Sequence, residues 1–179
     1  MLTDSVARRS IAIANRYPRL RIERRDIVQV IATLDAHRAD FLMGCPSGEL
    51  SLVFLTDAAL AQLHADFLAD PSTTDVITFE GNHAAGIAGE ICVSVDTAAA
   101  YAKEHGRNFS EELTLYLVHG WLHLAGYDDL QPAKKRVMRR AEARALHLLR
   151  EKLGQLPRFT FKSSAKAAPK IRRPVQRRT

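Results

Sequence analysis

The chain has 179 residues, a net charge of +6, and apolar and charged fractions of 46% and 26%, which are those of an ordinary globular protein. Its length suits one domain with a sizeable core. No apolar run approaches the roughly 18 residues of a membrane span. Residues 1–30 contain several arginines and therefore lack the uninterrupted apolar core of a signal peptide. Cys45 and Cys92 lie far apart and imply no disulfide framework. We therefore expect a cytoplasmic protein with reduced thiols.

The excess basic charge is concentrated at the carboxyl end of the chain. Residues 156–179 hold eight basic residues and no acidic residue, which leaves residues 1–155 close to neutral. Prolines and small polar residues separate these charges, so we predict one domain over residues 1–155 and a disordered basic tail over residues 156–179. Such a tail binds RNA by releasing counterions, although a purely solubilising role fits the same composition.

The first half of the chain predicts two strands, a short extended piece and two helices. Ile11-Ala12-Ile13 predicts an edge strand, and Leu20-Arg21-Ile22 a short extended piece. Asp26 is expected to cap a helix with apolar periodicity. Residues 49–55 alternate and then become continuously apolar, which predicts a strand buried in a sheet. Thr56-Asp57 then predicts the cap of a second helix.

The second half predicts two neighbouring strands, at residues 76–79 and 87–95, followed by helices. Asp96 is expected to begin a helix that runs to Tyr101. Ser110 is a suitable cap for a strongly apolar helix that belongs in the core. Residues 132–153 predict the last helix, with proline at its start. Helices packed about a small sheet predict an α+β (mixed α/β) fold.

The last predicted helix carries a row of basic side chains. They are Lys134, Lys135, Arg136, Arg139, Arg140 and Arg144. The row is compatible with a solvated helix face and with a face that contacts RNA, and its spacing does not separate the two.

A metal-binding pattern lies inside the apolar helix that Ser110 begins. The segment H-G-W-L-H-L-A-G-Y-D-D contains two histidines four residues apart, His119 and His123. Side chains at this spacing share one helix face, so both imidazoles can reach one ion. Gly126 stands where a helix commonly ends with positive φ, so the chain can bring Asp128 or Asp129 to the same point. Three protein ligands with one open position are typical of a catalytic zinc site.

Other interpretations of the histidine pair remain open. Two core histidines that bind no metal would show the same spacing, although buried imidazoles without partners cost free energy. A metallohydrolase of peptides or small esters is disfavoured, because the protease signature H-E-x-x-H needs a glutamate as general base after the first histidine. Gly120 occupies that position.

The metal segment resembles the signature of the YbeY family, endoribonucleases also called rRNA maturation factors. The family form is H-G-x-L-H-L-x-G-Y-D-H, and ten of the eleven positions agree; Asp129 replaces the last histidine. Residues 74–79 resemble the family's T-D-V-L-S-F, and residues 89–91 its G-D-I. The resemblance covers roughly residues 8–153 and implies that the metal-bearing helix lies against the sheet.

The resemblance implies a single-strand-specific endoribonuclease that uses one zinc ion, acts in 16S rRNA 3′-end processing and takes part in ribosome quality control. His119, His123 and Asp129 would hold the ion, and ribosomal RNA of the small subunit would be the partner. Asp128, Asp75 and Glu90 are candidate catalytic residues, although Asp75 also suits a turn before a strand. The alternative is a ribosome-associated RNA-binding assembly factor whose metal is mainly structural.

Two departures from the family pattern affect the chemistry. Asp129 is anionic where histidine is neutral, which lowers the charge of the metal centre and makes the ion a weaker Lewis acid. The family segment N-x-x-[YF]-R, whose arginine could hold phosphate, is matched here by His64 at the asparagine position and Leu68 at the arginine position. Phosphate contact must therefore come from elsewhere in this chain.

Overall fold

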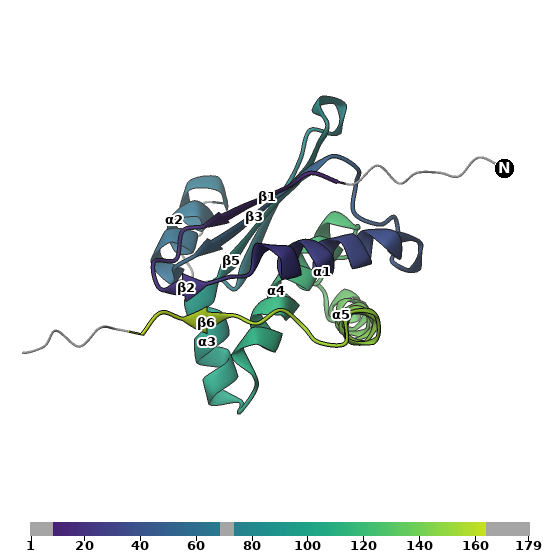
Figure 1. Cartoon of the computed structure of the whole chain (residues 1–179). Helices are drawn as coiled ribbons and strands as arrows, with labels where there is room; N and C mark the ends of the chain where they lie inside the picture. Colours follow the sequence, from purple (N-terminus) through teal and green to yellow (C-terminus); the bar gives the residue numbers. More distant parts are fainter. Residues whose placement is uncertain (1–8, 69–73, 164–179) are drawn as a thin grey trace, which may run out of the picture.

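The computed structural model describes residues 9–68 and 74–163, where helices pack about a small sheet (Figure 1). The sheet has the strand order β1-β3-β5-β4. Its strands are β1 (Ile11–Asn15), β3 (Glu49–Leu55), β5 (Ile87–Ser94) and β4 (Val76–Glu80). β1, β3 and β5 run parallel, and β4 is antiparallel to β5. The predicted α+β class is confirmed, as are the edge position of β1 and the pairing of β4 with β5.

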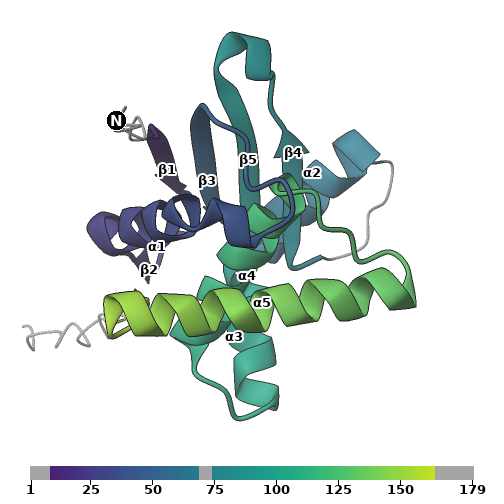
Figure 2. The ribbon, with the colours of Figure 1, turned by 90° about the vertical axis from the view of Figure 1, so that its right-hand side faces the viewer.

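Helices cover both faces of this sheet. They are α1 (Arg24–Ala36), α2 (Asp57–Leu68), α3 (Val95–Glu104), α4 (Phe109–Leu124) and α5 (Pro132–Leu153), with short 3-10 turns at Arg38–Asp40 and His83–Ala85. On one face, the larger core joins the sheet to α1, α4 and α5; on the other, Leu60 of α2 packs on a smaller cluster. Figure 2 shows α5 lying across α4. None of the helices in the described ranges is both long and apolar enough to cross a membrane.

α4 occupies the centre of the larger core. Its Trp121 is fully buried, and the indole Nε1 donates a hydrogen bond of 3.0 Å to Asp35 of α1. A Cβ atom at position 120 would collide with the side chain of Ile91 in β5, so Gly120 permits α4 to approach the sheet closely. Gly120, which stands where the protease signature has its glutamate, therefore has a packing role.

The observed starts of three helices lie one to three residues before the predicted ones. α1 begins at Arg24, and Asp26 lies in its first turn, where its charge complements the helix dipole. α3 begins at Val95, expected to end a strand, because the Ser94 side chain accepts a hydrogen bond from Thr97 N–H. α4 is capped by Asn108, whose side chain accepts hydrogen bonds from the N–H groups of residues 110 and 111. Ser110 is thus inside the helix.

The boundary expected at residue 155 is too early. Strand β6 (Thr160–Phe161) pairs antiparallel with β2 (Leu20–Arg21). Phe159 is buried, and its ring centroid lies 5.8 Å from that of Phe54. Apolar residues between the basic ones thus dock this segment on the domain, which composition alone did not reveal. Residues 164–179, the rest of the predicted tail, lie outside the described residues.

Candidate metal centre

Three potential ligand atoms converge beside the carboxyl end of α4. The Nε2 atoms of His119 and His123 lie 2.9 Å apart. The Asp129 carboxylate lies 3.7 Å from the first nitrogen and 3.8 Å from the second. Among the described residues, this is the one group of three metal-ligating side chains with donor atoms all within 4.8 Å of one another. The structure therefore brings together His119, His123 and Asp129, and of the two adjacent aspartates it is Asp129 that reaches the site.

Local backbone geometry explains this convergence. α4 ends at Leu124, and Gly126 adopts a φ of 95°, a conformation that favours glycine. The N–H of Gly126 donates to the carbonyl of His123 (2.9 Å), and the N–H of Tyr127 donates to the carbonyl of Leu122 (3.0 Å). These bonds reverse the chain over the end of the helix. Asp129 is thereby returned to the imidazoles.

A second layer of hydrogen bonds fixes both rings. His119 Nδ1 lies 2.7 Å from Oε1 of Glu142 in α5, and His123 Nδ1 lies 3.1 Å from the carbonyl oxygen of Tyr127. Since both partners accept, each Nδ1 donates, and each Nε2 is left with its lone pair toward the common point. Metal-binding histidines are commonly oriented in this way. Glu142 carries no local motif, so the sequence did not identify it.

The two imidazoles have different proton affinities. Burial lowers the pKa of His119, but the hydrogen bond that His119 donates to Glu142 and the charges of Glu142, Asp75 and Asp129 outweigh it, so the pKa is raised overall. The pKa of His123 is lowered by burial and by repulsion from His119. A proton shared between the two Nε2 atoms, or a cation bound by both, would relieve the repulsion of facing lone pairs.

The donor set fits a divalent transition metal. Two imidazoles and one carboxylate are ligands that zinc accepts, and three protein ligands leave a position open. Each of the three residues is partly buried, and two of them, His119 and Asp129, line a cleft. A closed structural site would need a fourth protein ligand at this point.

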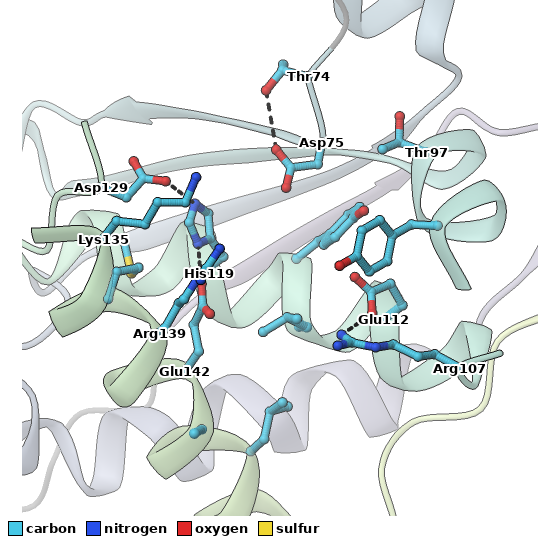
Figure 3. Close-up of a pocket in the computed structure, with 16 residues that line it drawn as sticks. Thr74, Asp75, Thr97, Arg107, Glu112, His119, Asp129, Lys135, Arg139 and Glu142 are labelled. Carbon is cyan, nitrogen blue, oxygen red and sulfur yellow. Dashed lines mark hydrogen bonds and ion pairs between the residues drawn. The ribbon is translucent and has the colours of Figure 1, made fainter. Parts of the chain in front are cut away.

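The site opens into a cleft of about 910 Å³ between α3, α4, α5 and the start of β4. Figure 3 shows His119 and Asp129 at one end, beside residues of α5. Arg107 and Glu112 form an ion pair of 3.5 Å at the other end. Polar and apolar side chains both line the cleft, and the guanidinium carbon of Arg107 lies 5.4 Å from the ring centroid of Tyr101.

Asp75 lies in the wall of this cleft. Its Oδ1 accepts a hydrogen bond of 3.0 Å from the backbone N–H of Val76, so the carboxylate also shapes the turn before β4. Its charge contributes to the raised pKa of His119. Both interpretations made from the sequence are therefore compatible with its position.

Glu90 was expected to approach the three potential ligands, but it lies on the opposite face of the sheet. Successive side chains in a strand point to opposite faces, and Ile91 is the residue of β5 that meets Gly120 of α4. Glu90 therefore shares the other face with Cys92, whose Sγ lies 3.6 Å from its carboxylate. The sequence did not show which alternate residues of the strand would face α4.

Asp128, another predicted catalytic residue, makes its contacts within the loop that follows α4 and at the start of α5. Its carboxylate accepts hydrogen bonds from the N–H of Leu130 (2.9 Å) and from Lys134 Nζ (2.6 Å). The bond with Lys134 lowers the pKa of Asp128. These contacts stabilise the loop between α4 and α5 on the protein surface.

Comparison with known proteins agrees with this geometry. A family model described as Endoribonuclease YbeY matches residues 12–150, which include all three potential ligands and Glu142. The chain belongs to the YbeY family. This result confirms the resemblance inferred from the metal segment.

Relatives named Endoribonuclease YbeY extend the match. The chain is 38% identical over 130 residues to the protein of Anaeromyxobacter dehalogenans, covering 70% of this chain and 67% of the relative. It is 41% identical over 107 residues to that of Protochlamydia amoebophila, covering 58% and 71%. The solution structure of TM1509 from Thermotoga maritima has the same fold, with a TM-score of 0.55 at 20% identity over 80% of this chain and 91% of that one.

Proposed function

We propose that this chain is a zinc-dependent endoribonuclease that cleaves single-stranded RNA in the cleft beside His119, His123 and Asp129. One observation carries the proposal. Two Nε2 atoms lie 2.9 Å apart and face one carboxylate at the end of a cleft, with each Nδ1 already engaged. Membership of the YbeY family, whose relatives are named endoribonucleases, supports RNA as the substrate.

The protein residues have distinct tasks in this proposal. His119, His123 and Asp129 would hold the ion, and Glu142 orients the His119 ring. A bound zinc ion lowers the pKa of a coordinated water and polarises a phosphate oxygen. Asp75 is our candidate for the base that accepts the proton of the attacking water, because it lines the same cleft and its charge acts on His119.

The biological setting is part of the same proposal. We expect the enzyme to act in the cytoplasm on small-subunit ribosomal RNA, in 3′-end maturation and ribosome quality control. Family resemblance supports this setting. The basic residues of 164–179, outside the described ranges, are proposed as a salt-dependent RNA contact.

The first test compares metal content and RNA cleavage in protein without a histidine tag. Wild type should carry close to one equivalent of zinc and cleave a fluorescent single-stranded RNA, whereas His119→Ala/His123→Ala should do neither while keeping its circular dichroism. The matched control is His83→Ala/His147→Ala, which removes two exposed imidazoles and should behave as wild type.

The outcomes separate the candidate functions. Metal-loaded, folded wild type that cleaves no RNA contradicts the enzyme and favours an assembly factor with a structural metal. Equal RNA cleavage by wild type and the double-histidine variant would contradict the assigned site. Cleavage of peptides or esters, but not RNA, would indicate the metallohydrolase.

A further inference from the structure

The cleft contains two cationic side chains that no carboxylate neutralises. Lys135 and Arg139 of α5 line it together with His119 and Asp129, and Figure 3 shows both beside these residues. Within residues 9–68 and 74–163, neither cation forms an ion pair, whereas Arg107 at the far end is paired with Glu112. An unpaired cation in a cleft is available to an anionic ligand.

The structure divides the basic row of α5 into groups with different surroundings. Lys134 Nζ lies 2.6 Å from Asp128. Arg144 donates a hydrogen bond of 3.1 Å to the Tyr127 hydroxyl, and its guanidinium carbon lies 4.7 Å from the ring centroid of Phe41. Lys134 and Arg144 therefore stabilise contacts within the protein.

Four members of the row remain. All four are exposed, but only Lys135 and Arg139 line the cleft, and Arg136 and Arg140 do not. The row is therefore not uniform: Arg136 and Arg140 belong to a solvated face, whereas Lys135 and Arg139 are placed to contact a ligand in the cleft.

Helical periodicity accounts for this division. Positions 135, 139, 142 and 146 follow the i, i+4, i+7, i+11 spacing of one helix face, and all four line the cleft. Glu142 holds His119, so Arg139 lies about one turn and Lys135 about two turns toward the start of α5. Both cations are consequently on the wall next to the metal ligands.

Charge and shape favour phosphate as the ligand. Asp75, Asp129 and Glu142 give negative charge to other parts of the cleft wall. Among the described residues, an RNA strand in the cleft would therefore meet unpaired cations only at Lys135 and Arg139 of α5. A guanidinium binds phosphate oxygens through a planar fork, and an ammonium binds them as a point charge. Leu68, at the position where the family resemblance expects an arginine, offers neither.

We propose that Lys135 and Arg139 bind RNA backbone phosphates that flank the phosphate cleaved at the metal centre. The inference rests on the proposed endoribonuclease function and adds a phosphate-binding subsite to it. The subsite lies on α5, and Glu142 on the same helix face couples its position to that of His119.

The test compares two double variants with equal loss of charge from one helix. Lys135→Gln/Arg139→Gln removes the cations that line the cleft, and Arg136→Gln/Arg140→Gln removes neighbouring cations that do not line it. KM and kcat are measured with a fluorescent single-stranded 12-mer RNA. We expect the first variant to raise KM about tenfold, with kcat changed less than about threefold, because contacts to flanking phosphates bind substrate and transition state alike. The second should change KM less than about twofold.

Two further readouts exclude a structural effect. The zinc content of both variants should equal that of wild type. The salt dependence of binding should become shallower by about 1.4 in the log–log slope for the cleft variant only, since each lost contact to a single strand removes about 0.7. Lys135→Arg/Arg139→Lys, which keeps both charges, should recover most of the lost affinity.

Binding measurements keep this inference separate from the proposed function. The Kd of a fluorescent 2′-O-methyl 12-mer, measured by anisotropy with the zinc-loaded protein, reports phosphate contact without turnover. A loss of affinity confined to the cleft variant would support the subsite. It would do so even if wild type cleaved no RNA, because absence of cleavage contradicts the proposed enzymatic function and not the subsite. Equal Kd and KM changes in the two double variants would overturn the subsite and show a solvated basic face.

Discussion

Oε1 of Glu142 lies 2.7 Å from Nδ1 of His119 and thereby joins α5 to α4, the helix that carries the two histidines. The contact sets the tautomer of the imidazole, because an accepting carboxylate requires Nδ1 to donate. It also raises the pKa of His119 against the opposing effect of burial. A side chain 23 positions away in the sequence therefore decides which nitrogen of His119 faces the ligand set.

Replacement of Glu142 should weaken metal binding although Glu142 is not a ligand. In Glu142→Ala, we expect zinc affinity to fall about 10–100-fold, the usual consequence of losing an outer-sphere partner. Competition with a chromogenic chelator measures the change. Glu151→Ala is the control, because Glu151 is an exposed carboxylate of the same helix paired with Lys152 at 3.0 Å. Equal affinities in the two variants would show that Glu142 does not orient His119.

The adjacent aspartates should respond differently to neutralisation. Asp129→Asn replaces the anionic ligand oxygen with a weaker amide donor, so zinc affinity and RNA cleavage should both fall. Asp128→Asn removes the partner of Lys134 but leaves the ligand set intact, so zinc content should be unchanged. Elemental analysis after dialysis distinguishes them. A larger loss of zinc from Asp128→Asn would reverse the assignment made from the geometry.

The ligand set could be predicted because its geometry is local. An i, i+4 pair and a following glycine constrain the chain over one turn, so the sequence predicted that His119, His123 and one of two aspartates would meet. The strands and helices were predicted from periodicity in the same way. Spacing alone left Asp128 and Asp129 as alternatives, because the outcome depends on how the loop enters α5, and it was the family resemblance that assigned Asp129.

The parts that depend on packing were missed or misassigned. Glu142 reaches the site through α5, and the face of Glu90 depends on which side of β5 receives α4. Phe159 is buried by docking on Phe54, although the charges around it predicted a disordered segment. In each case the deciding contact joins residues distant in sequence, and periodicity within one element carries no information about it.

The contact between α4 and β5 should make position 120 intolerant of a side chain. Gly120→Ala would place a methyl group against Ile91, which is fully buried and stiff at χ1. Overpacking of this kind costs about 1–3 kcal/mol, and the gain in helix propensity returns less than about 1 kcal/mol. Urea unfolding should therefore show a lower free energy of unfolding for the variant.

A double-mutant cycle with Ile91→Ala provides the control. The smaller side chain makes room for the new methyl group, so the double variant should be more stable than the sum of the two single effects predicts. Strict additivity would show that Gly120 and Ile91 do not determine the approach of α4 to the sheet.

The hydroxyl group of Tyr17 should give the protein a specific sensitivity to alkaline pH. It donates a hydrogen bond of 2.8 Å to Asp96 at the start of α3, and this bond, together with burial and the negative charge of Asp96, raises the pKa of Tyr17 above 10.0. The unfolded chain releases the phenolic proton near its ordinary pKa, whereas the folded chain retains it to higher pH. The stabilisation is therefore fully present below pH 10 and is lost as pH rises through the folded pKa.

Tyr17→Phe removes both the hydrogen bond and this titration. Between pH 7 and 9 its thermal unfolding midpoint should lie below that of wild type by a constant interval, and above pH 10 the interval should narrow. The other tyrosines are common to both proteins, so their titration cancels in the comparison. A raised pKa of Tyr17 in the folded state requires wild type to lose stability more steeply than Tyr17→Phe above pH 10. An interval that stays constant to pH 11 would therefore show that ionisation of Tyr17 is not coupled to folding through the bond with Asp96.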